Sequence, residues 1–202
     1  MAHYFSASPD SADARREIAV TLAGRTVDVY TSGGVFSPGR LDLGTAQLLR
    51  AGADLPETGT FVDVGCGWGP IALDMALARP GANVWAVDVN ERARELTAAN
   101  AERLGCRVRV ADPGQALAAL ESIDVLRSNP PIRIGKGALH ELLATWLPRL
   151  APDGYGELVV SKNLGADSLA RWISAELSLA CERIASRKGY RILRVSRDGA
   201  DI

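Results

Sequence analysis

The segment DVGCGWGP, from Asp63 to Pro70, decides the fold class of this chain. It contains the end of the short apolar run TFVDV (60–64), which is typical of a buried strand, and Pro70 is a residue type favoured in the first turn of a helix. The spacing G-x-G-x-G lets the backbone turn sharply and pass close to a ligand where a β-carbon would collide. The helix start adds backbone N–H groups without partners. The segment therefore predicts a strand–turn–helix unit that receives a cofactor.

From Thr60 onward, short apolar runs alternate with amphipathic helical patterns, which is typical of βα units that build a parallel sheet. The last two strands follow each other across SRKG (186–189) without a helix, so they should form an antiparallel hairpin. We expect an α/β domain with a Rossmann-like, seven-stranded, mostly parallel sheet. Helices are predicted at 70–79, 90–104, 114–120, 137–150 and 166–178. Strands are predicted at 60–64, 83–88, 106–110, 122–127, 155–161, 180–186 and 190–196.

Ahead of this domain, two short segments read as a small N-terminal β-hairpin. EIAVTL (17–22) and RTVDVYT (25–31) flank Ala23-Gly24 with β-branched alternation. The segment LDLGTAQLLRAG (41–52) then predicts a short helix with Asp42 near its N-cap. We expect residues 1–55 to be a hairpin and helix appended to a core domain of residues 56–202.

The composition is that of a folded protein of one main domain. The chain has 202 residues, of which 47% are apolar and 23% charged. Because it lacks a run of about 18 apolar residues and a signal-like start, we expect a cytoplasmic protein without a membrane segment. Three scattered cysteines and two histidines predict no metal site. The net charge of -1 argues against nucleic-acid binding by bulk electrostatics alone.

An acidic residue at the end of the second strand complements the glycine turn. Asp88 stands 25 positions beyond Asp63, where a carboxylate would meet the two hydroxyls of a ribose. Asp63 can bind the ammonium of an amino-acid moiety, directly or through water. The spacing also differs from the G-x-G-x-x-G of dinucleotide sites, which favours a cofactor without pyrophosphate. S-adenosyl-L-methionine is therefore expected, and the alternative is an ordinary glycine turn with Asp88 as a helix cap.

The segment Asn129-Pro130-Pro131-Ile132 follows the fourth strand, at the sheet edge where ligands collect. Consecutive prolines fix φ and remove two N–H donors, so the backbone presents carbonyl acceptors in a preset direction. The side-chain carbonyl of Asn129 adds another acceptor. These acceptors could grip the hydrogens of a planar amine, with Ile132 against its ring. The alternative is a loop without a catalytic role.

Several of these segments together resemble one known family. HYFS (3–6), GVFSPGRLDLGTAQLL (34–49), DVGCGWGPIAL (63–73), AVDVNERARELTAAN (86–100), SNPPIRIGKG (128–137) and GYRILR (189–194) look, in that order, like segments of the small-methyltransferase-domain (MTS) family. Its best-known members are bacterial 16S rRNA guanine-N2 methyltransferases. The resemblance implies a Rossmann-like class I methyltransferase fold, with the methyltransferase domain in residues 56–202.

The resemblance also implies roles for residues at the matching positions. Asn129, Pro130, Pro131 and Ile132 would bind the target amine and form the catalytic segment. Asp88 would hold the ribose and Asp112 would lie near the adenine amine. The full set expected to bind S-adenosyl-L-methionine is Asp63, Gly65, Cys66, Gly67, Gly69, Asp88, Val89, Asp112, Asn129 and Thr45.

The acceptor side is expected to involve the segment of Phe36, Arg40, Asp42, Gly44 and Thr45. This segment looks like the family element that covers the methionine end of the cofactor and the target pocket. Ile132 stands where relatives acting on adenine N6 or protein glutamine commonly carry an aromatic residue, which favours guanine N2. We expect ribosomal RNA or the small ribosomal subunit as partner. Phosphates would meet Arg127, Arg133 and Lys136, and the basic final stretch of Arg183, Arg187, Lys188, Arg191, Arg194 and Arg197.

Two alternatives remain open from the sequence. One keeps the cofactor but changes the acceptor to a protein glutamine, adenine N6, another RNA base or a small molecule. The other is a non-catalytic module that binds the cofactor or RNA. The sequence does not determine the oligomeric state.

Overall fold

The computed structural model describes residues 15–131 and 134–197, which form two β-sheets. A small N-terminal hairpin pairs β1 (Arg15–Leu22) with β2 (Arg25–Ser32). The main sheet has the strand order β5-β4-β3-β6-β7-β9-β8, and only β9 runs antiparallel to its neighbours. This confirms the predicted fold class. The seven strands are β3 (Thr60–Val64), β4 (Asn83–Val87), β5 (Arg109–Ala111), β6 (Ile123–Ser128), β7 (Leu150–Ser161), β8 (Ala180–Arg187) and β9 (Tyr190–Ser196).

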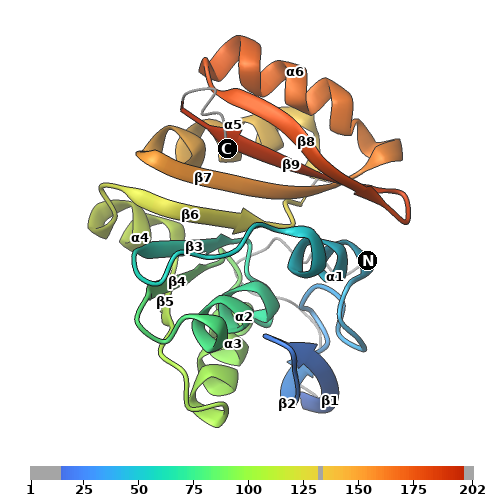
Figure 1. Cartoon of the computed structure of the whole chain (residues 1–202). Coiled ribbons are helices and arrows are strands. Elements are labelled where there is room, and N and C mark those ends of the chain that lie inside the picture. Colours follow the sequence, from blue (N-terminus) through green and yellow to red (C-terminus); the bar gives the residue numbers. More distant parts are fainter. Residues whose placement is uncertain (1–14, 132–133, 198–202) are drawn as a thin grey trace.

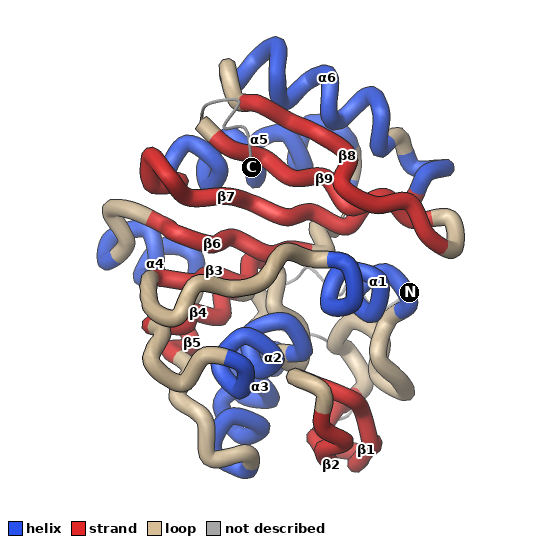
Figure 2. The backbone as a smooth tube through the Cα atoms, in the orientation of Figure 1, coloured by secondary structure: helices blue, strands red, loops and turns tan. Residues whose placement is uncertain are grey.

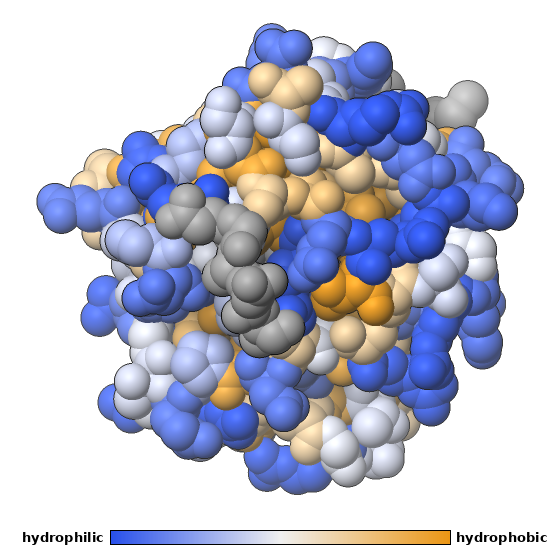
Figure 3. Space-filling view, turned by 45° about the horizontal axis from the view of Figure 1, so that its top comes forward, coloured by the Kyte–Doolittle hydropathy of each residue, from blue (hydrophilic) through white to orange (hydrophobic). Residues whose placement is uncertain are grey.

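Helices cover both faces of this sheet (Figures 1 and 2). One face packs against α1 (Leu43–Ala51) and α2 (Pro70–Ala78), with α3 (Glu91–Arg103) beside α2. The other face packs against α4 (Pro113–Ala119), α5 (Lys136–Trp146) and α6 (Ala166–Leu177). Short 3₁₀ helices, η2 (Leu147–Arg149) and η3 (Lys162–Leu164), flank β7. In Figure 3 the surface is mostly hydrophilic, with apolar side chains gathered near the middle of that face.

The N-terminal hairpin docks on α2 and α3 through both apolar and polar contacts. Val20, Leu22 and Val29 pack in one buried cluster with Trp68 and Leu96. The side chain of Asn100, on α3, accepts a hydrogen bond from the backbone N–H of Tyr30 at 2.6 Å and donates to its carbonyl at 2.9 Å. Satisfying these backbone groups at the edge of β2 fixes the hairpin against the core.

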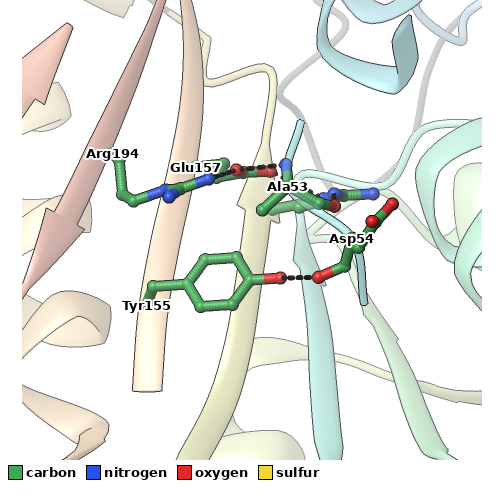
Figure 4. A network of polar contacts seen from close by, with 6 residues as sticks. Ala53, Asp54, Tyr155, Glu157 and Arg194 are labelled. Atoms are coloured by element: carbon green, nitrogen blue, oxygen red, sulfur yellow. Dashed lines mark hydrogen bonds and ion pairs between the residues drawn. The ribbon is translucent and has the colours of Figure 1, made fainter. Parts of the chain in front are cut away.

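A buried cluster of charges joins the segment before β3 to the middle of the sheet (Figure 4). Glu157, which has no exposed surface, accepts from Arg127 at 3.0 Å and from Arg194 at 3.0 Å. The backbone N–H of Ala53 donates to the same carboxylate at 2.7 Å, and its carbonyl accepts from Arg127 at 2.7 Å. A β-carbon on Gly52 would lie 2.5 Å from the Arg127 guanidinium, so a larger residue there would have to displace the buried ion pair.

This cluster overturns part of the predicted phosphate-binding surface. The prediction for Arg127 is wrong, because its side chain is only 4% exposed and pairs with Glu157. Arg194 is committed to the same carboxylate, and the buried Arg191 pairs with Asp167. Arg197 donates to the carbonyl of Leu150 at 2.6 Å. In the final basic stretch, the exposed side chains free of such a role are Arg183, Arg187 and Lys188.

Three predicted boundaries differ from the structure for local reasons. The strand predicted at 106–110 begins only at Arg109, because Cys106 donates to the carbonyl of Ala101 and completes the last turn after α3. β7 begins at Leu150 rather than 155, so it includes the turn-like sequence PDG (152–154). The register of its pairing with β6 shifts at this point. α5 stops at Trp146, since Pro148 ends the regular helix.

Candidate active site

The carboxyl ends of β3, β4, β6 and β7 border a cavity of about 600 Å³. The chain order of the strands reverses between β3 and β6, and ligands of open α/β sheets bind at such a point. The charged side chains that line this cavity, among the described residues, are Asp42 and Asp88; no lysine or arginine is among them. The cavity is therefore suited to a cationic or hydroxyl-bearing ligand and unsuited to a pyrophosphate.

The glycine turn forms the floor of the cavity. Gly65, Gly67 and Gly69 have φ angles of 79°, 60° and 93°, which belong to the left-handed region that favours glycine. No atom lies within 4 Å of the position of a β-carbon on Gly65, so this glycine leaves open space. Thr97, on α3, donates from Oγ1 to the carbonyl of Gly67 at 3.0 Å. The turn is thus held from below and stays open above.

Asp88 links the glycine turn to the start of α3. Its carboxylate accepts from the backbone N–H of Gly67 at 2.9 Å and from that of Asn90 at 2.9 Å. Burial raises its pKa, and the hydrogen bonds from Asn90 and Gly67 oppose this shift. A carboxylate has about four acceptor positions, so two remain for hydroxyl groups of a ligand in the cavity.

Asp63 lies below the turn and does not line the cavity. It is fully buried, and its Oδ2 accepts from the backbone N–H of Ala72 at 3.0 Å. Its Oδ1 is buried without a partner among the described residues. Loss of hydration raises the pKa of Asp63 to about 8. The predicted contact between Asp63 and a ligand is therefore not a direct one in this arrangement, and it would run through water or a small rearrangement.

Asn129 enters the cavity from the end of β6 in a fixed orientation. Its Nδ2 donates to Oδ2 of Asp42 at 2.8 Å and to Oγ1 of Thr45 at 3.0 Å. Its carbonyl Oδ1 is left to accept a hydrogen bond. Pro130 and Pro131 also line the cavity, as predicted for the NPPI segment. The predicted residues Ile132 and Arg133 lie outside the described residues.

The segment before α1 forms the opposite wall of the site. The side-chain amide of Asn90 donates to the carbonyl of Gly34 at 2.9 Å, and Arg92 donates to that of Gly33 at 3.0 Å. These contacts bring Phe36, which is 45% exposed, to the mouth of the cavity. A second, small pocket of about 20 Å³ is lined by Thr45 and Cys66, and shares Phe36 and Asn129 with the cavity. Burial raises the pKa of the Cys66 thiol, which stays neutral.

Other predicted residues lie beside the cavity or apart from it. Val89 lines it with a 46% exposed side chain. Asp112 accepts from the N–H of Gln115 at 3.0 Å and caps α4, while the neighbouring Pro113 lines the cavity. Arg40 and Lys136 are exposed and do not line it.

The cavity is also lined by residues that the sequence did not single out. Ser161 ends β7, Leu164 ends η3, and Tyr190 begins β9 opposite Ser161. Ser161 could have been found, because it closes a predicted parallel strand at the ligand-binding edge. Tyr190 gave no such signal, since it reaches the cavity only through the antiparallel pairing of β9 with β7.

No group of three or more His, Cys, Asp or Glu side chains in residues 15–131 and 134–197 could hold a metal ion. Within the same ranges, no helix is long and apolar enough to cross a bilayer.

Two known proteins match this chain over most of its length. The chain is 29% identical over 198 residues to the uncharacterized protein YbxB of Bacillus subtilis, covering 96% of this chain and 98% of that protein. It is 30% identical over 200 residues to ribosomal RNA small subunit methyltransferase C of Stutzerimonas stutzeri, covering 95% of this chain but only 57% of that protein.

A solved structure has the same fold. The 16S rRNA N2 G1207 methyltransferase of T. thermophilus, in complex with AdoMet and guanosine, matches with a TM-score of 0.76 and 20% identity, over 91% of this chain and 51% of that chain. The sequence itself matches the methyltransferase small domain over residues 26–194. The chain thus belongs to the methyltransferase small-domain family of S-adenosylmethionine-dependent methyltransferases.

Proposed function

We propose that this protein transfers a methyl group from S-adenosylmethionine to the exocyclic N2 amine of a guanine in ribosomal RNA. The observation that carries the proposal is the cavity itself, which has only acidic charged groups among its described lining residues and a fixed carbonyl acceptor on Asn129. Acidic lining suits a sulfonium and an ammonium, and a carbonyl acceptor suits an amine.

The residues present fit this cofactor. Gly65 leaves room for it, Asp88 keeps acceptor positions for the two ribose hydroxyls, and the buried Oδ1 of Asp63 lacks the partner that an ammonium could supply through water. Thr45, Cys66, Gly67, Gly69, Val89 and Asp112 are proposed as further cofactor-binding residues, and Asn129 is assigned to the target amine. When bound, S-adenosylmethionine supplies an activated methyl group on a sulfonium.

At the acceptor end, Asn129 and the backbone carbonyl of Pro130 would accept hydrogen bonds from the two amine hydrogens. This holds the nitrogen in line for attack and keeps its lone pair free. Pro131 and Ile132 complete the proposed catalytic segment. Phe36 would cover one face of the base, and its exposed ring is suited to that task.

Ribosomal RNA is proposed as the substrate because two relatives are named for activity on it. A base in a duplex would have to leave its stack to enter the cavity. Exposed cations would then hold the flanking phosphates: Arg40 and Lys136 from the predicted set, together with Lys162, Arg187 and Lys188. Arg133 is proposed from the sequence alone.

A methylation assay on ribosomal particles tests the proposal. Labelled S-adenosylmethionine is supplied to small ribosomal subunits prepared without base methylation, and the modified nucleotide is mapped. Label at guanine N2 supports the proposal. Label in protein or at another base would contradict it and would identify one of the alternative acceptors as the substrate. Asn129→Ala is the control, with turnover reduced about 100-fold or more and cofactor affinity nearly unchanged. If no variant of the protein binds the cofactor, a non-catalytic RNA-binding module is the remaining interpretation.

A further inference from the structure

The orientation of the Asn129 amide is set by a chain of hydrogen bonds that begins at the helix terminus of α1. The backbone N–H of Thr45 donates to Oδ2 of Asp42 at 3.0 Å, as expected for an N-cap. The same oxygen accepts from Nδ2 of Asn129 at 2.8 Å. Thr45 contributes a second contact to Nδ2 through Oγ1, at 3.0 Å.

The two contacts to Nδ2 are not equivalent in what they specify. A hydroxyl such as that of Thr45 can donate or accept, so by itself it would tolerate either orientation of the Asn129 amide. An ionised carboxylate only accepts. Asp42 therefore decides that Asn129 turns its NH₂ group toward α1 and its carbonyl toward the cavity.

This orientation has a consequence for the acceptor. A carbonyl oxygen in the cavity attracts a group that donates a hydrogen bond, whereas an NH₂ group there would repel an amine and attract a group that only accepts. We propose that Asp42 is a positioning residue that fixes the amide of Asn129 and so restricts the site to acceptors bearing N–H hydrogens. The inference rests on the proposed function only for the identity of the amine.

Two substitutions at the same position separate this role from helix capping. Asp42→Ser keeps an oxygen that caps α1 but is too short to reach Asn129. Asp42→Asn keeps an oxygen that must still accept from Thr45 N–H and can therefore accept from Asn129 as well. We expect Asp42→Ser to lower kcat by about 10- to 100-fold. Asp42→Asn should keep a kcat close to that of the wild type.

The amide of Asn129 gives a readout that does not depend on turnover. In nitrogen-15 labelled protein, both Nδ2 protons should be protected from exchange in the wild type and in Asp42→Asn. In Asp42→Ser, the proton that faces residue 42 should lose its protection. Rapid exchange in the wild type would overturn the proposal even if Asp42→Ser does not fold. The proposal would also be overturned if Asp42→Ser had the same kcat as the wild type. The same holds if Asp42→Ser and Asp42→Asn lost kcat and melting temperature to the same extent. A wild type that shows the protection but does not methylate RNA would count only against the proposed function.

Discussion

Glu157 and Asp63 are both fully buried carboxylates, yet their surroundings are opposite. Glu157 is neutralised by two arginines and receives a backbone N–H. Asp63 receives one backbone N–H, has an oxygen without a partner, and has its pKa raised to about 8. The first arrangement leaves nothing for a ligand to supply. The second is stable only as the neutral acid or with a cation brought from outside.

The positions of the two residues match this difference. Glu157 lies within β7 and ties the segment before β3 to the sheet, so its pairing supports the scaffold. Asp63 lies next to the glycine turn, at the edge where the cavity opens. Of these two buried carboxylates, the incompletely paired one is therefore the one beside the cavity, as is common for functional carboxylates.

The largest effect on stability is expected from breaking the ion pairs of Glu157. Glu157→Gln should lower the free energy of unfolding by about 3–5 kcal/mol, because it leaves the two arginines buried without a counter-charge. Urea denaturation measures this. Tyr155→Phe, which removes only a 3.2 Å hydrogen bond to Asp54, is the matched control and should cost about 1 kcal/mol or less. Equal stability of Glu157→Gln and the wild type would show that the cluster is dispensable.

The incomplete hydrogen bonding of Asp63 predicts that the stability of the protein depends on pH. The pKa of Asp63 rises from 3.8 to about 8 on folding, so its contribution to stability is present below pH 3.8 and is lost as the pH rises to about 8. Relative to Asp63→Asn, the wild type should lose up to about 1.4 kcal/mol per pH unit in this window. Urea titrations from pH 4 to 9 measure the difference. A constant difference would mean that Asp63 does not titrate there. Saturating cofactor product, which carries an ammonium, should flatten the slope.

The local parts of the site could be predicted from the sequence. The glycine turn requires three left-handed residues between a strand and a helix, and that requirement is met within a few adjacent positions. The same holds for the two prolines after β6. The fold followed for the same reason, since each βα unit is marked by its own apolar run and its own glycine or proline.

The parts formed by distant segments could not be predicted. The partners of Asn129 lie 84 and 87 residues away in the chain, and nothing in their local pattern identifies them. From the sequence alone, Arg127 resembles a surface cation. Its burial follows only from the central position of its strand and from its partner Glu157, which lies 30 residues further along the chain. In both cases the decisive fact is which strands become neighbours, which is a property of the whole sheet.

Asp88 is intermediate between the fully paired Glu157 and the poorly paired Asp63. It accepts two backbone hydrogen bonds and keeps acceptor positions toward the cavity. Asp88→Asn should weaken binding of S-adenosylmethionine by about 10- to 100-fold, since one hydroxyl loses a charged acceptor. Calorimetric titration with the cofactor and with its demethylated product measures this, and both should weaken alike because both carry the ribose. A loss confined to the methylated form would assign Asp88 to the sulfonium instead.

The smallest effect is expected outside the cavity, where the acidic lining gives way to exposed cations. Lys162 follows Ser161, and its N–H donates to the carbonyl of Gly189 at 2.8 Å, which keeps it beside Arg187 and Lys188. If Lys162 meets one phosphate, Lys162→Gln should reduce the slope of log affinity for RNA against log salt by about 0.7–0.9 and leave cofactor binding unchanged. Arg25→Gln is the control, because Arg25 contacts Leu77 at the end of α2 remote from the glycine turn. An equal change in slope for both variants would mean that RNA is held by the overall charge of the surface rather than by this rim of the cavity.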